Sequence, residues 1–318
     1  MKTSTDQVRH ALNGATMGTR WSALFYTDSA FDPAPVQAAL QKAVDRVDVQ
    51  MSTWNPDSVL MQLNRAPVGA WVEVPDDLVK VLTLALHVGE ASGGAFDIGM
   101  GDAVRAWGFG PQQADVDHIR SAMAVSRRPA HSLLALEGRQ VRKLDEITID
   151  LNGIAKGYGV DRLAETLQEA GIKAALVGID GEMRAWGCRP DGEVWTIAVE
   201  APDPDLRAPH SMLCLHDAAV ATSGDYRHWV NVNGRRLAHT MDPRRGAPLV
   251  ASPASVTVVA STCAEADAWA TALMVMGLEA GKTFAARKGL SALFLTRDDA
   301  GGVMGTGCGR LFDGSSAV

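Results

Sequence analysis

The sequence predicts an α+β fold with mostly antiparallel sheet and packed helices, over a chain of 318 residues. Two observations carry this prediction. Expected strands follow one another through short turns, at Gly138 and at Asn233-Gly234, and strands joined in this way pair antiparallel. Between these strands lie segments with the apolar periodicity of amphipathic helices, such as Pro35–Met51 and Pro75–Ser92.

Turn and cap signals place the elements of the N-terminal half. A strand enters through Gly18, a short helix follows Pro56 with Ser52 or Asn55 as its cap, and Gly93-Gly94 stops a longer helix. The elements expected in this half are a strand at Met17–Tyr26, helices at Pro35–Met51 and Pro75–Ser92, and a helix followed by a hairpin within residues 115–146.

The C-terminal half is predicted to be mainly strands, with one helix before the last two. Asn233-Gly234 is typical of a two-residue hairpin turn, and Gly277 closes a strong helix. The elements expected here are a strand–turn–strand at Ala174–Trp186, a strand at Val194–Glu200, two strands within Ala219–Pro248, a strand at Ser255–Ala260, a helix at Cys263–Gly277, and strands at Ala292–Thr296 and Val303–Phe312.

Composition excludes several classes of protein. The formal net charge is −7 and no block rich in Lys and Arg occurs, which argues against a nucleic-acid partner. The four cysteines lie far apart, so they fit reduced thiols better than a zinc site or a disulfide framework. No apolar run reaches about 18 residues, so we expect no transmembrane segment. The start of the chain lacks the apolar stretch of a signal peptide, which predicts a cytoplasmic protein, or a periplasmic or membrane-anchored one if the N-terminus was trimmed.

The stretch Ile147–Asp161 (ITIDLNGIAKGYGVD) organises the prediction of a site. Its alternating apolar residues predict a strand at Ile147–Leu151, which turns at Asn152-Gly153 into a helix from about Ile154. A helix that starts at a strand end offers backbone N–H groups and a positive dipole end to an anion, and Asp150 and Lys156 lie at this point. The alternative is an ordinary turn with a solvated lysine.

The helix Cys263–Gly277 carries apolar residues around most of its surface, so we expect it to be buried. Asp267 and Thr271 stand four residues apart on one face of this helix. A buried carboxylate needs a partner, and a carboxylate with a hydroxyl provides the hard oxygens that suit Mg²⁺. The alternative is a salt bridge or a backbone cap made by Asp267.

Two aromatic segments are candidate ligand contacts. Trp54 occupies a predicted capping turn, where it either fills the edge of the core or lies against a planar ligand. The glycine-rich stretch Gly93–Pro111 contains Asp97 and Asp102, and its aromatic side chains make it too apolar for a solvated loop.

His239 follows an expected strand and lies near Asp242, Arg244 and Arg245 in the sequence. A histidine at this place is a candidate general base. The arginines are candidates for holding a phosphate or a carboxylate. The alternative is a loop histidine that bonds to its neighbours, beside solvated arginines.

Taken together, these segments resemble the ApbE family, the FAD:protein FMN transferases. The similarity lies in eight collinear motifs: Met17–Thr19 (MGT), Met51–Ser58 (MSTWNPDS), Gly94–Asp97 (GAFD), Trp107–Pro111 (WGFGP), Asp150–Asp161 (DLNGIAKGYGVD), Ala221–Arg227 (ATSGDYR), His239–Pro248 (HTMDPRRGAP) and Ala266–Leu273 (ADAWATAL).

The resemblance implies a T-fold-like architecture and a reaction. Residues 1–318 would form one domain of two intertwined α/β halves, with FAD in the cleft between them. Mg²⁺-bound FAD would be attacked by a threonine or serine hydroxyl of an acceptor protein at the phosphorus of its FMN half, and AMP would leave. The alternatives are FAD hydrolysis to FMN and AMP, and a flavin-binding or carrier protein without catalysis.

The resemblance also implies roles for individual residues. Asp267, Thr271 and the main-chain carbonyl of Gly153 would bind the metal, and His239 would be the base. The residues expected to contact FAD are Met17 and Trp54 beside the isoalloxazine, Ala95, Phe96 and Asp97 in the adenosine or flavin pocket, and Asp150, Lys156 and Met241.

Three features depart from the family pattern. Trp54 stands where the family usually has tyrosine, and it can still stack on a flavin. Gly178–Glu182 (GIDGE) is an altered form of a glycine-glycine-aspartate segment. Most family members are exported, whereas this sequence shows no signal or lipid-attachment cysteine near its start.

Overall fold

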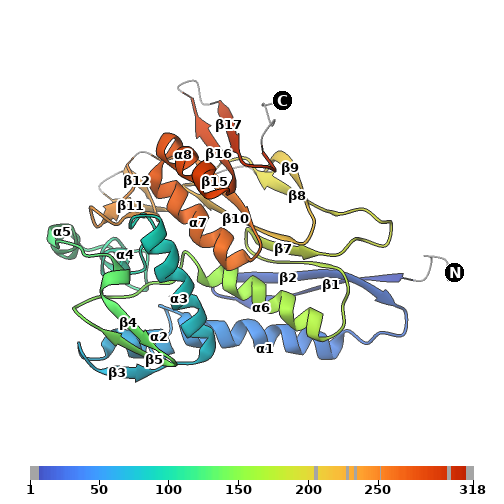
Figure 1. Ribbon diagram of the computed structural model, residues 1–318, viewed down its shortest axis with the longest axis horizontal. Coiled ribbons are helices and arrows are strands. Elements are labelled where there is room, and N and C mark those ends of the chain that lie inside the picture. The colour runs from blue at the N-terminus through green and yellow to red at the C-terminus, as the bar shows by residue number, and fades with distance from the viewer. Residues whose placement is uncertain are drawn as a thin grey trace.

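The centre of the molecule is an eight-stranded sheet in which every neighbouring pair is antiparallel (Figure 1). The computed structural model describes residues 7–312 apart from 204–206, 227–228, 233–234, 251 and 299–301. In spatial order the strands are β1 (Gln7–Thr16), β2 (Thr19–Asp28), β6 (Ala175–Ile179), β7 (Glu182–Trp186), β10 (Ala218–Gly224), β15 (Ser255–Ala260), β16 (Ser291–Arg297) and β17 (Val303–Cys308). The predicted α+β class with mostly antiparallel sheet is confirmed.

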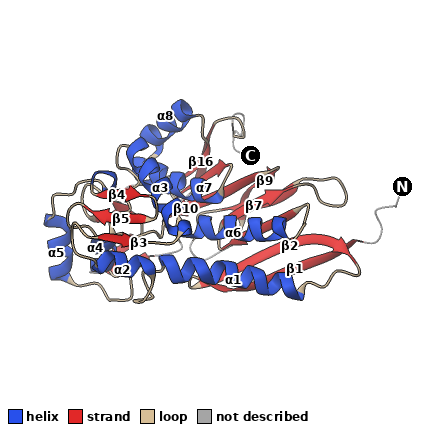
Figure 2. Ribbon diagram, turned by 60° about the horizontal axis from the view of Figure 1, so that its bottom comes forward, coloured by secondary structure: helices blue, strands red, loops and turns tan. Residues whose placement is uncertain are grey.

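Helices cover one face of this sheet, as Figure 2 shows for α1, α6 and α7. Alternation along β16 explains the two layers, because Phe294 lies in the helix-side core whereas Leu293 and Leu295 lie in a second core on the other face. The hairpin of β8 (Trp195–Glu200) and β9 (Pro209–Leu215) closes that second core. The helices on the first face are α1 (Ala34–Met51), α6 (Ala155–Glu169), α7 (Cys263–Met276) and α8 (Leu278–Lys288).

Residues 52–151 gather at one end of the sheet, beside α7 (Figure 1). They contribute α3 (Asp76–Ala91), whose apolar face joins α7 in the largest core. The other elements of this region are α2 (Val59–Arg65), α4 (Gly101–Ala106), α5 (Val116–Ala124), the 3₁₀ turn η1 (Ala130–Ser132), and a small sheet of β3 (Trp71–Glu73), β5 (Gln140–Lys143) and β4 (Leu134–Glu137).

Two short hairpins follow β10. The strands β11 (Trp229–Val232) and β12 (Arg235–Ala238) pair antiparallel, while the predicted Asn233-Gly234 turn lies outside the described residues. The strands β13 (Met241–Asp242) and β14 (Ala247–Pro248) form the second hairpin. Among the described residues, none of the helices is long and apolar enough to cross a membrane.

The predicted strand Ile147–Leu151 is wrong, although its buried alternation is right. Ile147, Ile149 and Leu151 are buried, but among the described residues no strand pairs with this segment. Its backbone groups bond instead to a side chain and to a loop: Asn64 Oδ1 accepts from Ile149 N at 2.7 Å, and Asn64 Nδ2 donates to Ile149 O at 2.9 Å. Asp150 N donates to Ile98 O at 2.8 Å. These bonds satisfy the buried backbone without a ladder.

Other predicted boundaries shift for local reasons. The strand expected from Met17 begins at Thr19, because Met17 and Gly18 form the turn of the β1–β2 hairpin with φ of 45° and 72°. The cap of α2 is Ser58, which accepts from Met61 N, and neither Ser52 nor Asn55. No element was predicted for β1, β3, β9, α4 or α8, and β10 to β14 lie within residues 218–248, where only two strands were expected.

Candidate metal and cofactor site

Thr271 lies against the turn that leads residues 147–151 into α6, and Asp267 lies against the first turn of α6. A Cβ placed on Gly153 in this turn would lie 3.2 Å from Thr271 Oγ1 and 3.2 Å from Cε2 of Phe96, so glycine allows the close approach. One turn further along α6, the N–H of Gly157 donates to Oδ2 of Asp267 at 3.1 Å. Asp267 is buried, at 5% exposure. The structure therefore brings the predicted pair and the predicted turn together.

This arrangement fits a small hard cation. The hydrogen bond from α6 uses one lone pair of Oδ2 of Asp267, so the carboxylate keeps lone pairs for a metal. The hydroxyl of Thr271 and the carbonyl of Gly153 add neutral oxygen donors, and Mg²⁺ prefers such ligands. Within the described residues, no cluster of three His, Cys, Asp or Glu side chains forms a metal site. A cation here would therefore depend on hydroxyl, carbonyl and substrate oxygens in addition to one carboxylate.

The surroundings of Asp267 are strongly charged. Burial, together with the negative charge of Glu182, raises the pKa of the Asp267 carboxyl to about 7. Glu182 on β7 is 2% exposed and accepts from Lys156 Nζ through Oε1 at 2.8 Å. Burial opposes the charge of Lys156, but Glu182 and Asp267 outweigh it and raise the pKa of the ammonium group. Among the residues that the structure describes, none forms a hydrogen bond with the buried Oε2 of Glu182.

Asp180 adds a further carboxylate at the turn between β6 and β7. Its Oδ2 lies 3.8 Å from Lys156 Nζ, and its φ of 56° is the left-handed value that a two-residue hairpin turn requires. With all groups ionised, the carboxylates of Asp180, Glu182 and Asp267 outnumber the single ammonium of Lys156 by two. This excess negative charge matches one divalent cation. Asp180 and Glu182 were not among the predicted site residues, and their one signal in the sequence is the altered GIDGE segment.

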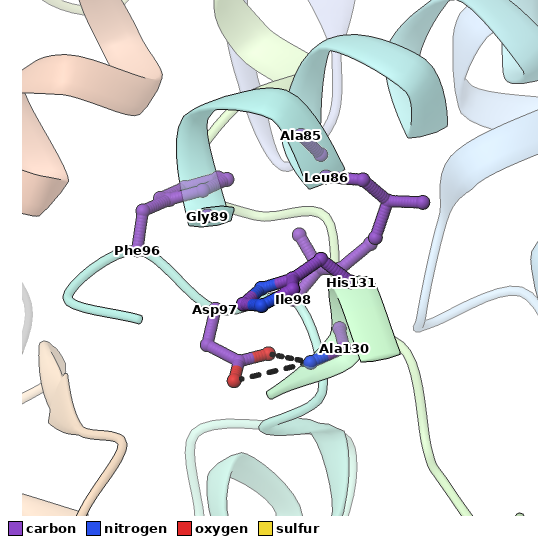
Figure 3. A pocket seen from close by; sticks show the side chains of 8 residues that line it. All are labelled: Ala85, Leu86, Gly89, Phe96, Asp97, Ile98, Ala130 and His131. Carbon is purple, nitrogen blue, oxygen red and sulfur yellow. Dashed lines mark hydrogen bonds between the residues drawn. The ribbon is translucent and has the colours of Figure 1, made fainter. Parts of the chain in front are cut away.

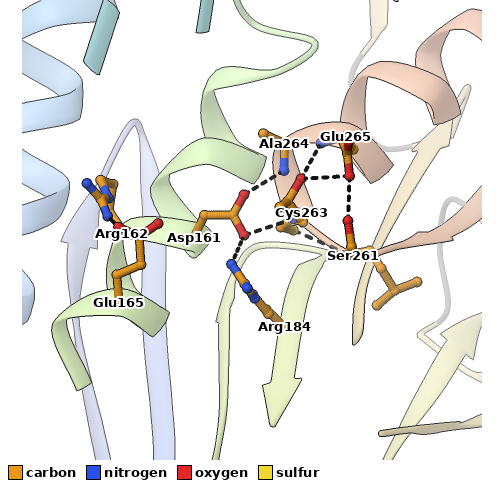
Figure 4. Close-up of polar contacts among 10 residues, drawn as sticks. Asp161, Arg162, Glu165, Arg184, Ser261, Cys263, Ala264 and Glu265 are labelled. Atoms are coloured by element: carbon orange, nitrogen blue, oxygen red, sulfur yellow. Dashed lines mark hydrogen bonds and ion pairs between the residues drawn. The ribbon is translucent and has the colours of Figure 1, made fainter. Parts of the chain in front are cut away.

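A buried carboxylate sets the position of α7 against α6, as Figure 4 shows. Asp161 Oδ1 accepts from Cys263 N and Oδ2 from Ala264 N, both at 2.9 Å, at the start of α7. Arg184 Nη1 donates to the same carboxylate at 2.7 Å. Burial raises the pKa of Asp161, although these three donors favour its ionised form. The register of α7, and with it the place of Asp267, depends on this contact.

We expect Asp161→Asn to lower the free energy of unfolding by about 1–3 kcal/mol, because the amide leaves at least one buried donor without an acceptor. Urea unfolding of the two proteins measures the difference. The control is Asp117→Asn, whose side chain is 89% exposed and which should change stability by less than about 0.5 kcal/mol. Equal stability of the wild type and Asp161→Asn would contradict the assigned role.

The predicted flavin neighbours Met17 and Trp54 lie in exposed or turn positions. Trp54 is 60% exposed, so the interpretation that it fills the edge of the core is wrong. Its backbone N–H and that of Asn55 both donate to Ser52 Oγ, which fixes the turn that carries the ring. The Met17 side chain packs over α6, where a Cβ on Gly159 would lie 3.1 Å from its Cε.

Asp97 holds two backbone segments together (Figure 3). Its Oδ1 accepts from Gly99 N at 2.7 Å and from Ala130 N at 3.2 Å, while burial raises the pKa of the carboxyl. The hollow beside it is lined by Ala85, Leu86, Gly89, Phe96, Ile98 and His131 and has no room for a ligand. A ligand contact of Ala95, Phe96 or Asp97 therefore has to lie outside this hollow, and their assignment to the adenosine or flavin pocket stays a prediction.

Asp150 lies just before the turn and close to α4. Its Oδ1 accepts from Asn152 N at 2.8 Å. Although the side chain keeps partial contact with solvent, the protein packed around it raises the pKa of the carboxyl to about 6, against the opposing effects of that hydrogen bond and of Arg105. A carboxyl with this pKa changes its charge close to neutral pH.

His239 lies between β12 and β13, and Met241 begins β13; both contact the glycine-rich segment. The His239 ring meets the Phe109 ring edge-on, with centroids 6.4 Å apart. Met241 is buried in a small core with Met100 and Trp107, so its side chain anchors the loop between β12 and β13. Trp107 Nε1 donates to the carbonyl oxygen of Gly246, in the turn between β13 and β14, at 2.9 Å. The anchored loop fixes the place of His239, while the contact of Met241 with FAD stays a prediction.

One hydroxyl beside the metal candidates was missed. Ser223 at the end of β10 lies with Oγ 3.1 Å from Thr271 Oγ1. Ser223 was not among the predicted site residues, and it belongs to a strand of the central sheet. The contact between Ser223 and Thr271 follows from the packing of α7 on β10, which the sequence does not show.

Comparison with known proteins gives the same family as the motifs. The chain matches the ApbE family over residues 17–294. It is 32% identical to a FAD:protein FMN transferase of Klebsiella pneumoniae (strain 342) over 297 residues, which are 91% of this chain and 85% of that protein. The structure of the flavin transferase ApbE from Vibrio cholerae superposes with a TM-score of 0.85 at 32% identity, covering 96% of this chain and 99% of that one. The apo form of Pseudomonas stutzeri flavinyl transferase ApbE gives a TM-score of 0.84 at 31% identity, over 97% and 96% of the two chains.

The antiparallel α+β fold, with a carboxylate and a hydroxyl of α7 turned to the start of α6, is therefore the fold of a class of transferases. The chain belongs to the ApbE family. The predicted family, fold class and enzyme class are confirmed.

Proposed function

We propose that this enzyme transfers the FMN moiety of FAD to a threonine or serine hydroxyl of an acceptor protein and releases AMP. The observation that carries the proposal is the contact of Thr271 with the Gly153 turn and of Asp267 with Gly157 in the first turn of α6, in a chain of the ApbE family. A carboxylate, a hydroxyl and a carbonyl in one place suit a cation that binds pyrophosphate. In this proposal the chain is one domain of two intertwined halves, and FAD lies in the cleft between them.

The bonds in this reaction balance without a redox step. The acceptor oxygen forms a bond to the phosphorus of the FMN half, and the bond from that phosphorus to the bridging pyrophosphate oxygen breaks. AMP departs with that oxygen, and FMN stays on the acceptor as a phosphoester. The proton of the acceptor hydroxyl passes to His239. Mg²⁺ held by Asp267, Thr271 and the Gly153 carbonyl would act as a Lewis acid that offsets charge on the pyrophosphate.

The remaining residues bind and orient the substrate. Met17 and Trp54 would hold the isoalloxazine, because a flat exposed indole suits stacking on a planar ring. Lys156 would compensate phosphate charge, and Glu182 keeps it in place through the 2.8 Å contact. Asp150 and Met241 would complete the contacts with FAD.

The test is a mixture of the protein with FAD, Mg²⁺ and a peptide that carries an acceptor threonine. Flavin fluorescence that stays with the peptide in a denaturing gel supports transfer. Free FMN and AMP, with no labelled peptide, would show a pyrophosphatase that uses water as acceptor. FAD that stays intact would show a binding or carrier protein, and would contradict the proposal.

We expect Trp54→Ala to weaken FAD binding about tenfold, because one aromatic stacking contact is lost and this is worth about 0.5–1.5 kcal/mol. The side chain is 60% exposed, so the melting temperature should not change. Quenching of flavin fluorescence measures the affinity, and Trp54→Tyr is the matched variant that keeps a stacking ring. Unchanged affinity in Trp54→Ala would exclude the stacking role.

A further inference from the structure

Strand β10 presents hydroxyl groups to both sides of the central sheet at neighbouring positions. Ser223 Oγ lies 3.1 Å from Thr271 Oγ1 on the side of α7. Thr222, one residue earlier, turns to the opposite face and lies 2.8 Å from the hydroxyl of Thr257 on β15. Only the first of these two hydroxyl pairs reaches the candidate metal site.

The chemistry of a hydroxyl ligand indicates which partner donates in the hydrogen bond between Thr271 and Ser223. A threonine that binds a cation uses a lone pair of Oγ1, and its hydrogen then has to point away from the metal to an acceptor. Threonine within a helix often turns this hydrogen to the carbonyl four residues earlier, here that of Asp267. The structure instead pairs the Thr271 hydroxyl with Ser223 on the neighbouring strand.

The space around Thr271 leaves little choice of rotamer. A Cβ on Gly153 would lie 3.2 Å from its Oγ1 and 3.5 Å from its Cγ2, so the threonine side chain is packed against the turn. A hydroxyl held between Gly153 and Ser223 has one side for a lone-pair interaction and the other for its hydrogen. Partners of this kind orient the direct ligands of metal sites and tune their affinity.

We propose that Ser223 is a positioning residue of the metal site: it accepts the hydroxyl hydrogen of Thr271 and keeps the Oγ1 lone pair directed to the cation. This inference rests on the proposed function, because it requires that Asp267, Thr271 and Gly153 bind Mg²⁺. It assigns to β10 a part in metal affinity in addition to its place in the sheet.

The test is a titration of the FAD-free full-length protein with Mg²⁺ alone, followed by the midpoint of thermal unfolding, which rises when a ligand binds the folded state. We expect Ser223→Ala to need about 10–100-fold more Mg²⁺ for the same stabilisation, in line with the usual effect of losing such a partner. Ser223→Thr keeps the acceptor and should restore the wild-type response. The matched control is Thr222→Val, which removes the neighbouring hydroxyl pair and should leave the response to Mg²⁺ unchanged.

A double-mutant cycle separates positioning from a general loss of packing. If Ser223 acts through Thr271, the substitution Ser223→Ala should have no further effect on Mg²⁺ affinity in a Thr271→Val background. Additive effects, or a wild-type response in Ser223→Ala, would overturn the inference and leave the proposed function standing. A wild-type protein that does not respond to Mg²⁺ would overturn the proposed metal site and the inference with it.

Discussion

Asp267→Asn is expected to lower turnover of FAD by about 10³-fold, since the metal ligand charge stabilises the transition state by about 4 kcal/mol when it is present. The fold should persist, because asparagine keeps an oxygen that accepts the N–H of Gly157 at the start of α6. Steady-state release of AMP at saturating Mg²⁺ measures the loss. Unchanged turnover would show that Asp267 does not hold the catalytic metal.

The control for this variant is Glu265→Gln on the same helix. Glu265 accepts from Ser261 Oγ and Thr262 Oγ1 at the N-terminus of α7, so its substitution lowers the stability of the helix without touching the site. We expect Glu265→Gln to lose some stability and keep its turnover. Asp267→Asn should show the reverse pattern, and this contrast distinguishes a ligand from a structural residue.

The raised pKa of Asp267 also fixes the sign of a pH effect. In the metal-free folded protein this carboxyl keeps its proton up to about pH 7, whereas in the unfolded chain it ionises near its ordinary pKa of 3.8. Between these values the folded state binds the additional proton, so the free energy of unfolding falls as the pH rises. Asp267→Asn lacks this loss and should gain stability relative to the wild type from about pH 4 to about pH 7. Mg²⁺ binds the ionised carboxylate, so it should stabilise the wild type more at pH 8 than at pH 5.

The candidate metal ligands could be predicted because they break a local pattern. The helix Cys263–Gly277 is apolar on nearly every side, and Asp267 in such a helix requires a partner whatever the rest of the fold. The turn at Gly153 is visible because a glycine precedes a helix start with a lysine in its first turn. Each of the two features can be recognised within its own short stretch of sequence. The structure brings the two stretches together.

The partners that surround these residues could not be predicted, since they come from distant strands. Glu182 reaches Lys156 across 26 positions of the sequence, and Ser223 reaches Thr271 across 48. Neither contact follows from periodicity or spacing, because it depends on which strand of the sheet lies beside α6 or α7. The error at Ile147–Leu151 has a related cause: the Asn64 side chain replaces the missing neighbouring strand.

His239→Ala is expected to lower the rate of flavin transfer by about 10²–10⁴-fold, the usual contribution of a general base. The affinity for FAD should stay within about threefold of the wild type, because a base that contacts the acceptor hydroxyl acts in the transition state and adds little to ground-state binding. Single-turnover labelling of an acceptor peptide gives the rate, and fluorescence quenching gives the FAD affinity. The matched control is His118→Ala, a surface histidine of α5 that should leave both quantities unchanged.

The anchoring of the loop makes this variant interpretable. Met241 and the bond from Trp107 Nε1 to Gly246 O hold the chain that follows His239 in a small core, so truncation of the ring should leave that chain in place. A collapse of FAD affinity in His239→Ala would therefore mean that the ring binds the substrate and is not the base. A lower rate of flavin transfer with retained FAD affinity would instead assign the proton transfer to His239. The base would then come from a different segment of the chain than the metal ligands of α7.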